Sequence, residues 1–148
     1  DAIQEFNERE YRKKNLIIFG IEELESEEPE QRKDHDMSIV NTVFESLCPE
    51  VSAGHKIYRI GKRQNGKVRP VKVILSSEDE VKKIVTKGRE IRKIPTYAKV
   101  TFSSDKTKKQ LTEYKILKES LKKRMEDGEQ DIKIKYIRGE PRIMKIKN

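Results

Sequence analysis

The strongest constraint on the fold is a series of short apolar bursts separated by polar segments. Two of them, Leu16-Ile17-Ile18-Phe19 and Val71-Lys72-Val73-Ile74-Leu75, are rich in β-branched residues and have the length of single strands. Such bursts argue against long disorder, although 41% of the 148 residues are charged and only 33% are hydrophobic. No apolar run approaches the roughly 20 residues needed to cross a bilayer. We therefore expect a small soluble protein with a thin core and no membrane partner.

The apolar periodicity predicts the order strand, helix, strand, strand, helix, strand between residues 15 and 103. Strands are expected at residues 15–21, 55–61, 68–75 and 97–102, and Asn65-Gly66 is expected to form the hairpin turn between the second and third. Asp36 is the expected N-cap of the first helix, which ends at Pro49, and Ser77 that of the second, which ends near Gly88. This order is that of the ferredoxin-like split βαβ fold, which RNA-recognition motifs share.

Two further segments flank this predicted α+β domain of residues 15–103. Residues 1–14 read as a helix with Ile3 and Phe6 on one side, and could be the end of a coiled coil. Residues 104–148 read as a small basic domain, in which a capping cluster at residues 103–105 precedes a helix over 106–125 and a β-hairpin. Leu111, Leu117 and Leu121 are the expected core residues of that helix. Because the chain begins with Asp1 rather than methionine, we expect further sequence upstream.

Charge is distributed unevenly along the chain. The net charge is +8, yet residues 1–91 sum to about −1 and residues 92–148 to about +9. Within the first part, residues 22–36 are mostly acidic, whereas residues 56–72 hold seven bases and no acid. We read the acidic run as a solvated loop and expect an anionic partner to avoid it and to seek the basic block.

The residues that enzymes and metal sites need are scarce. Asp34-His35-Asp36 is too contiguous to surround one ion, and His55 is the only other histidine. The single cysteine, Cys48, excludes an internal disulfide and favours a reducing, intracellular location. We expect no catalytic activity, no metal and no cofactor.

Several motifs in order resemble one protein family. They are Asn15 to Glu22, Arg59-Ile60-Gly61, Arg69 to Val73, Asp105-x-Thr107 before the long helix, and Ile134-Lys135-Tyr136 before a Gly-Pro hairpin. Together they resemble the nucleic-acid-binding protein encoded by the first open reading frame of LINE-type, non-LTR retrotransposons, over residues 15–148. Baculovirus few-polyhedra proteins share parts of the pattern.

The resemblance implies a trimerising coiled coil, an RNA-recognition-like domain and a small C-terminal domain, with single-stranded RNA or DNA bound between the last two. It also implies a nucleic-acid chaperone that coats retrotransposon RNA into ribonucleoprotein particles in the cytoplasm, with a nuclear location left open. Asn15, Arg69 and Tyr136 match family positions. Tyr114-Lys115 stands where mammalian relatives have two adjacent arginines, so only Lys115 keeps a charge there.

We expect phosphate contacts from nine bases: Arg59, Arg63, Arg69, Lys72, Lys99, Lys108, Lys115, Arg138 and Arg142. Tyr97 and Tyr136 are candidates for base stacking, although Tyr97 suits core packing equally well. Ile18 and the strand from Val71 to Leu75 bring no aromatic to the sheet, so backbone electrostatics are expected to dominate and sequence specificity to be low. The alternative is a protein-interaction module that binds an acidic partner surface through the basic C-terminal third.

Overall fold

The computed structural model describes residues 1–51 and 56–147, and within them it is a mixed α+β structure with four α-helices. Contacts divide it into two compact units. We call Asn7–Asp105 the sheet unit, and Asp1–Phe6 together with Lys106–Asn148 the hairpin unit. The elements, in chain order, are α1 (Ala2–Arg12), β1 (Asn15–Phe19), α2 (Pro29–Leu47), β2 (Ile57–Arg59), β3 (Val71–Ile74), α3 (Glu78–Lys87), the 3₁₀ turns Gly88–Lys93 and Pro95–Tyr97, β4 (Thr101–Ser104), α4 (Lys108–Glu126), β5 (Ile132–Ile137) and β6 (Glu140–Lys145).

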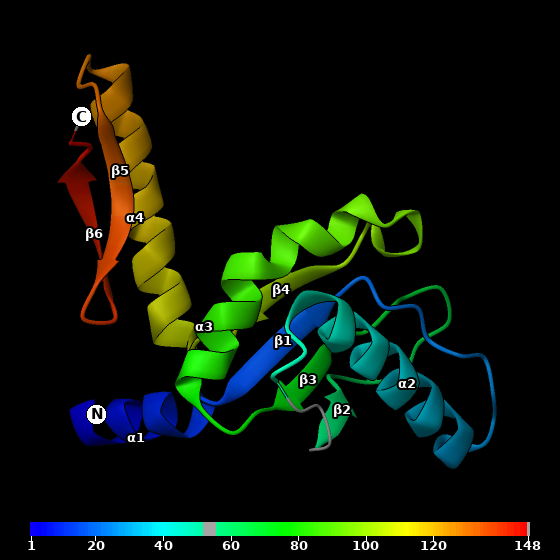
Figure 1. Cartoon of the computed structure of the whole chain (residues 1–148). Coiled ribbons are helices and arrows are strands. Elements are labelled where there is room, and N and C mark those ends of the chain that lie inside the picture. Colours follow the sequence, from blue (N-terminus) through cyan, green and yellow to red (C-terminus); the bar gives the residue numbers. More distant parts are fainter. Residues whose placement is uncertain (52–55, 148) are drawn as a thin grey trace. The chain divides into compact units, whose positions relative to one another are not determined.

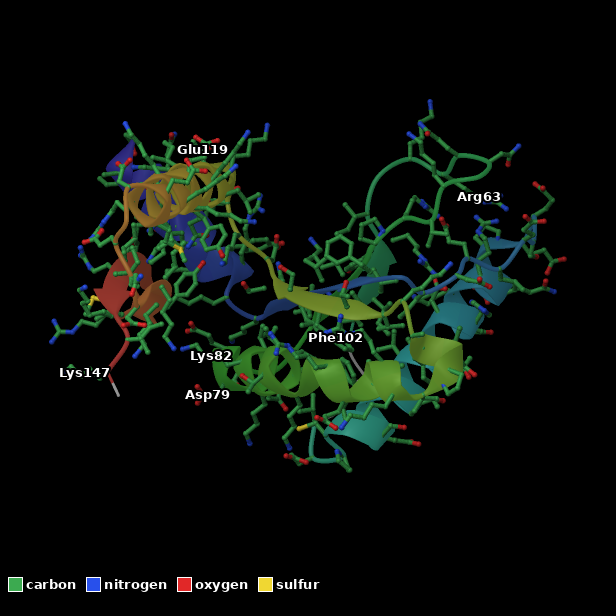
Figure 2. All side chains as sticks on the ribbon, turned by 90° about the horizontal axis from the view of Figure 1, so that it is seen from above. Arg63, Asp79, Lys82, Phe102, Glu119 and Lys147 are labelled. Atoms are coloured by element: carbon green, nitrogen blue, oxygen red, sulfur yellow. The ribbon has the colours of Figure 1, made fainter. Side chains whose placement is uncertain are left out.

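The sheet unit contains an antiparallel four-stranded sheet in the order β2-β3-β1-β4. Both α2 and α3 lie on one face of it (Figures 1 and 2). Leu16 and Ile18 of β1 and Val71 and Val73 of β3 are completely buried against these helices. Ile18 therefore points into the core, away from any surface where a base could stack.

The first helix begins earlier than its apolar pattern predicts. α2 starts at Pro29, whose fixed φ and missing N–H suit the first helical position. The negative charge of Glu30 in the first turn interacts favourably with the helix dipole. Asp36 is thus a residue of the helix interior and not its N-cap, and the second half of the expected acidic loop is helical. The prediction failed because the first two turns carry too few apolar residues to show a helical period.

Two other boundaries also differ from expectation. Tyr97 ends a 3₁₀ turn that begins at Pro95, and β4 starts only at Thr101. Tyr97 packs against the core, which confirms core packing rather than base stacking as its role. The β2–β3 connection is a long loop over residues 60–70, because Arg59 pairs with Val71, and the turn at Asn65-Gly66 lies inside that loop. His55, the expected start of the second strand, lies outside the described residues.

Gly20, just after β1, is required by a close backbone approach. Its φ is +87°, and a Cβ atom there would lie 2.1 Å from the carbonyl oxygen of Lys99. Any other residue would push β1 away from the turn that leads into β4.

The hairpin unit begins with a complete capping box. Thr107 accepts a hydrogen bond from the backbone N–H of Gln110, whose side chain accepts one from the N–H of Thr107. The cap is therefore Thr107 and not the cluster at residues 103–105. No residue of α4 is fully buried, and Leu111 is 56% exposed, so the prediction that it belongs to a core is wrong. Leu117 and Leu121 are half-buried.

Helix α1 also buries none of its residues, and Ile3 and Phe6 are exposed. No helix in the described part of the chain combines the length and apolar character needed to cross a bilayer.

Candidate nucleic-acid interface

Arg59 is fully occupied by partners within the sheet unit. It pairs with both carboxylate oxygens of Asp36, through Nε at 3.0 Å and Nη2 at 2.8 Å. Nη1 donates to the carbonyls of Ile21 and Arg69, each at 2.7 Å, and Nη2 also donates to the carbonyl of Glu22. A guanidinium has five N–H donors, and here all five are used. With 7% of its side chain exposed, Arg59 ties β2 to α2 and has no donor left for a phosphate.

Arg69 forms a second internal pair, with Glu23. Its Nε and Nη2 donate to Glu23 Oε1 at 3.0 and 2.7 Å, its backbone N–H donates to Oε2, and Nη1 donates to the carbonyl of Gly61. Burial alone would raise the pKa of the Glu23 carboxyl, but the hydrogen bonds and charge of Arg69, with the charge of Arg59, hold that pKa below its ordinary value. Arg69 therefore anchors the loop after β1.

Asn15 is likewise structural. It is 3% exposed, and its Nδ2 donates to Asp105 at 2.9 Å, while Arg12 binds the other carboxylate oxygen of Asp105. Three of the expected nucleic-acid contacts, Asn15, Arg59 and Arg69, are thus part of the internal framework. The acidic segment 22–36 and the basic segment 56–72 pair with each other through Glu23–Arg69 and Asp36–Arg59, which the expectation of separate surfaces missed.

The other expected bases of the sheet unit remain accessible. Arg63 is exposed on the β2–β3 loop (Figure 2), and Lys99 is exposed just before β4. Lys72 is half-buried on the sheet face opposite α2 and α3. These three bases lie on three different segments: the β2–β3 loop, the residues just before β4, and β3.

The β5–β6 hairpin of the other unit has two chemically distinct faces. Its register pairs Ile134 with Ile143 and Tyr136 with Pro141, and these side chains share a face with the buried Ile132. The opposite face, which we call the basic face, carries Lys133, Lys135, Ile137, Glu140, Arg142 and Met144. Alternation along each strand produces this separation.

Three bases of the basic face have no acidic partner. Lys133, Lys135 and Arg142 are exposed, and no described carboxylate lies within ion-pair distance of them. Lys135 and Arg142 are direct cross-strand neighbours, a like-charge arrangement that destabilises a hairpin. Arg138 extends the positive charge at the turn, where it adopts φ +51° beside Gly139 at φ +81°.

An aromatic and cationic cluster lies next to this hairpin. The rings of Tyr114 and Tyr136 are parallel within 8°, with centroids 6.4 Å apart. The Lys106 ammonium lies 4.4 Å from the Tyr136 centroid and 5.3 Å from that of Tyr114, and it donates to the Tyr136 hydroxyl. Tyr136 remains 48% exposed and is held in one orientation by these contacts.

Helix α4 adds a line of lysines. Lys108, Lys115, Lys118 and Lys122 are exposed and recur at spacings of three, four and seven residues, which place them along one side of a helix. A shallow depression of about 780 Å³ is lined by Lys115, Lys118, Leu121, Lys122 and Met125, together with Glu119 and Glu126. The predicted Lys108 and Lys115 thus belong to a longer stripe.

Sequence reasoning missed Lys106, Tyr114, Lys118, Lys122, Lys133 and Lys135 as site residues. The signal was present for the last two, because lysines alternate with Ile132, Ile134 and Tyr136. The stacking of Tyr114 on Tyr136 depends on how α4 docks on the hairpin, and no local pattern reveals that.

Residues suited to other chemistries do not converge. Among residues 1–51 and 56–147 there is no group of three His, Cys, Asp or Glu side chains that could hold a metal ion. Cys48 is buried, and burial raises the pKa of its thiol, so it is a poor nucleophile at neutral pH.

Comparison with known proteins gives no assignment: no family model matches this sequence, and no curated protein matches it.

Proposed function

We propose that this chain is a non-catalytic protein that binds single-stranded nucleic acid, mainly RNA, with low sequence specificity. The observation that carries the proposal is the basic face of the β5–β6 hairpin. There Lys133, Lys135 and Arg142 stand together without acidic partners, although two of them repel each other across the hairpin. A polyanion would convert that repulsion into attraction.

The aromatic cluster supports a single-stranded ligand. Tyr136 presents a half-exposed ring whose orientation is already fixed by Tyr114 and Lys106. Stacking on a tyrosine needs an unpaired base and accepts any base. Phosphate contacts likewise carry no sequence information.

We further assign the sheet unit to the ferredoxin-like class of RNA-recognition domains, and the whole chain to the retrotransposon proteins whose motifs it resembles. The strand order β2-β3-β1-β4 and the two helices on one face support the first assignment. The exposed Ile3 and Phe6 of α1 support a role as the end of a trimeric coiled coil. Three linked copies would strengthen weak binding and favour the coating of RNA into ribonucleoprotein particles, with chaperone activity, in the cytoplasm or the nucleus.

Salt-dependent binding tests the proposal. Fluorescence anisotropy with a labelled single-stranded RNA of about 30 nucleotides should show an affinity that falls log-linearly with salt, with a slope of about −0.7 per phosphate contact. The variant Lys133→Ala/Lys135→Ala/Arg142→Ala should reduce the size of that slope by about 2, since it removes three contacts.

The matched control is Lys13→Ala/Lys82→Ala/Lys93→Ala. It removes the same charge from lysines that are already paired with Glu10, Glu78 and Glu90. The control should keep a slope close to that of the wild type. Equal slopes for the two triple variants would contradict the proposed interface. No RNA binding by the wild type at low salt would reject the function and favour an acidic protein partner.

A further inference from the structure

A pocket within the sheet unit lies beside the start of α2. It has a volume of about 260 Å³ and is lined by residues of the loop after β1, of the first turns of α2 and of β2, together with Arg69. This volume is close to the lower end of the range for small-molecule sites, about 300 Å³. The pocket therefore suits a small ligand rather than a folded partner.

Four bases and two acids line the pocket, so its lining has a net charge of +2. Two of these bases belong to the internal ion pairs described above, which also account for both acids. The other two bases are Arg32 and Lys33, and they carry the whole excess of positive charge. Although residues 22–36 contain eight acids, none of them forms an ion pair with either base.

Arg32 is half-buried and keeps most of its donors available. Its Nη1 donates to the carbonyl of Ser26 at 2.6 Å, and this is its only described hydrogen bond. A guanidinium has five N–H donors, so four of them remain for a ligand. Lys33 follows directly in the chain, is exposed, and adds three donors with no described partner.

These two side chains suit a phosphate monoester. A guanidinium can bind two phosphate oxygens at once, and an ammonium group supplies a point charge for another oxygen. A phosphate monoester carries a charge of about −1.5 to −2 at pH 7, which matches the excess charge of the lining. α2 acts in the same sense, because its N-cap residue Glu28 makes no side-chain capping bond and leaves the positive end of the helix dipole uncapped.

The apolar part of the lining accommodates an organic group beside the phosphate. Ile57 is buried, whereas Leu24 is 37% exposed and Pro29 is exposed. A small ring placed against Leu24 and Pro29 would remove apolar surface from water. The lining therefore combines a charged subsite with an apolar one.

The remaining acids of the segment disfavour a polyanion. Six of the eight acids of residues 22–36 do not line the pocket, and all six are exposed. A nucleic-acid strand would bring several phosphates close to these carboxylates, whereas a small monoester brings only one. The charge pattern thus favours a small free ligand over RNA at this place.

We propose that this pocket binds a small organic phosphate monoester, with the phosphate on Arg32 and Lys33 and the organic group against Leu24, Pro29 and Ile57. The site goes beyond the proposed function and does not depend on it, because no residue of the β5–β6 hairpin takes part.

Phenyl phosphate is a suitable probe, because it joins a phosphate monoester to one apolar ring. Its titration into the full chain, followed by proton–nitrogen correlation NMR, should shift the backbone amides of Leu24, Arg32 and Lys33 and the side-chain Nε–H of Arg32. It should bind about tenfold more tightly than inorganic phosphate, which lacks the ring. Phenol, which lacks the phosphate, should not bind.

Charge-removing variants test the two bases. Arg32→Gln and Lys33→Gln should each weaken phenyl phosphate binding about tenfold or more, through the loss of charged hydrogen bonds. Lys33 is exposed, so its variant reports on binding even if Arg32→Gln disturbs the fold through the lost bond to Ser26. Arg63→Gln is the matched control and should bind like the wild type, because Arg63 is an exposed arginine of the same unit that does not line the pocket.

The outcomes separate this site from the RNA interface. The variant Lys133→Ala/Lys135→Ala/Arg142→Ala should weaken RNA binding and leave phenyl phosphate binding unchanged. If Arg32→Gln and Lys33→Gln bind phenyl phosphate as Arg63→Gln does, or if the shifts map to residues 132–145, the pocket is rejected and the proposed function stands. Binding of phenyl phosphate without any binding of RNA would give the opposite result.

Two further results would overturn the pocket. One is the absence of phenyl phosphate binding at millimolar concentrations. The other is displacement of phenyl phosphate by single-stranded RNA, which would make the pocket a part of the RNA interface.

Discussion

The two units use the same kinds of side chain in opposite ways. In the sheet unit, Arg59 and Arg69 are enclosed by acceptors that come from distant parts of the chain, and their charges stabilise the fold. In the hairpin unit, Lys133, Lys135 and Arg142 face outward with no described acidic partner. The difference shows that a basic segment in a sequence is not evidence of a binding surface until its acidic neighbours in space are known.

The largest effect is expected from breaking the Arg59–Asp36 pair. Arg59→Met should destabilise the sheet unit by about 3–5 kcal/mol, because it removes the guanidinium that pairs with Asp36. Asp36 is 10% exposed and keeps only the ring of its neighbour His35 as a described partner. Urea unfolding followed by circular dichroism measures the change. Asp36→Leu/Arg59→Met should recover part of the loss.

Arg63→Met is the control for that experiment, because Arg63 belongs to the same basic segment 56–72 but is exposed and makes no described ion pair. It should change stability by no more than about 0.5 kcal/mol. Equal losses for Arg59→Met and Arg63→Met would show that the internal pair is unimportant.

A smaller loss is expected for Arg69→Met, about 1.5–3 kcal/mol for its charged hydrogen bonds to Glu23. The effect should depend on pH. Because the pKa of Glu23 is lowered by folding, its contribution is fully present above its ordinary value near 4.5 and is lost as the pH falls through the folded-state pKa. The stability difference between wild type and Arg69→Met should therefore shrink below about pH 4.5, as measured by thermal unfolding in a pH series. A constant difference from pH 7 to pH 3 would contradict this origin.

The hairpin unit should depend more on local contacts than on distant ion pairs. Thr107→Ala removes the capping box of α4 and a hydrogen bond from the Thr107 hydroxyl to Glu5, and should cost about 1 kcal/mol. Hydrogen exchange of peptides from the first turns of α4 measures this local loss. Thr112→Ala, the same substitution at an exposed interior position of α4, should not increase exchange, since alanine has the higher helix propensity.

The smallest expected change in stability comes from a substitution that gives the hairpin a base–acid pair of the kind that the sheet unit contains. Arg142→Glu places an acid opposite Lys135 and should stabilise the hairpin by about 0.2–1 kcal/mol, while it weakens RNA binding. Arg142→Gln should lie between wild type and Arg142→Glu in both properties. A rise in stability with no loss of RNA affinity would remove Arg142 from the interface.

Local sequence signals predicted which helices and strands form more accurately than they predicted the residues at which these elements begin and end. Ser77 caps α3 as expected, accepting a hydrogen bond from the N–H of Glu80, and the hairpin turn falls at Gly139. The start of α2 was missed because its first turns are polar. For the candidate site, Arg63, Lys99, Lys108, Lys115, Tyr136, Arg138 and Arg142 were expected and are accessible, whereas Asn15, Arg59 and Arg69 are committed to internal bonds.

By itself, the sequence determined the types of element, their order and the concentration of positive charge in the last third of the chain. These features depend on periodicity, capping and composition, which act over a few residues. The tertiary structure alone decided which charges are neutralised and which rings face outward. Glu23 and Arg69 are 46 residues apart, and Asp36 and Arg59 are 23 apart, so only folding brings them together. Strand register decided the rest, because a shift of one residue would exchange Phe19 and Ile18 between the core and the opposite face of the sheet.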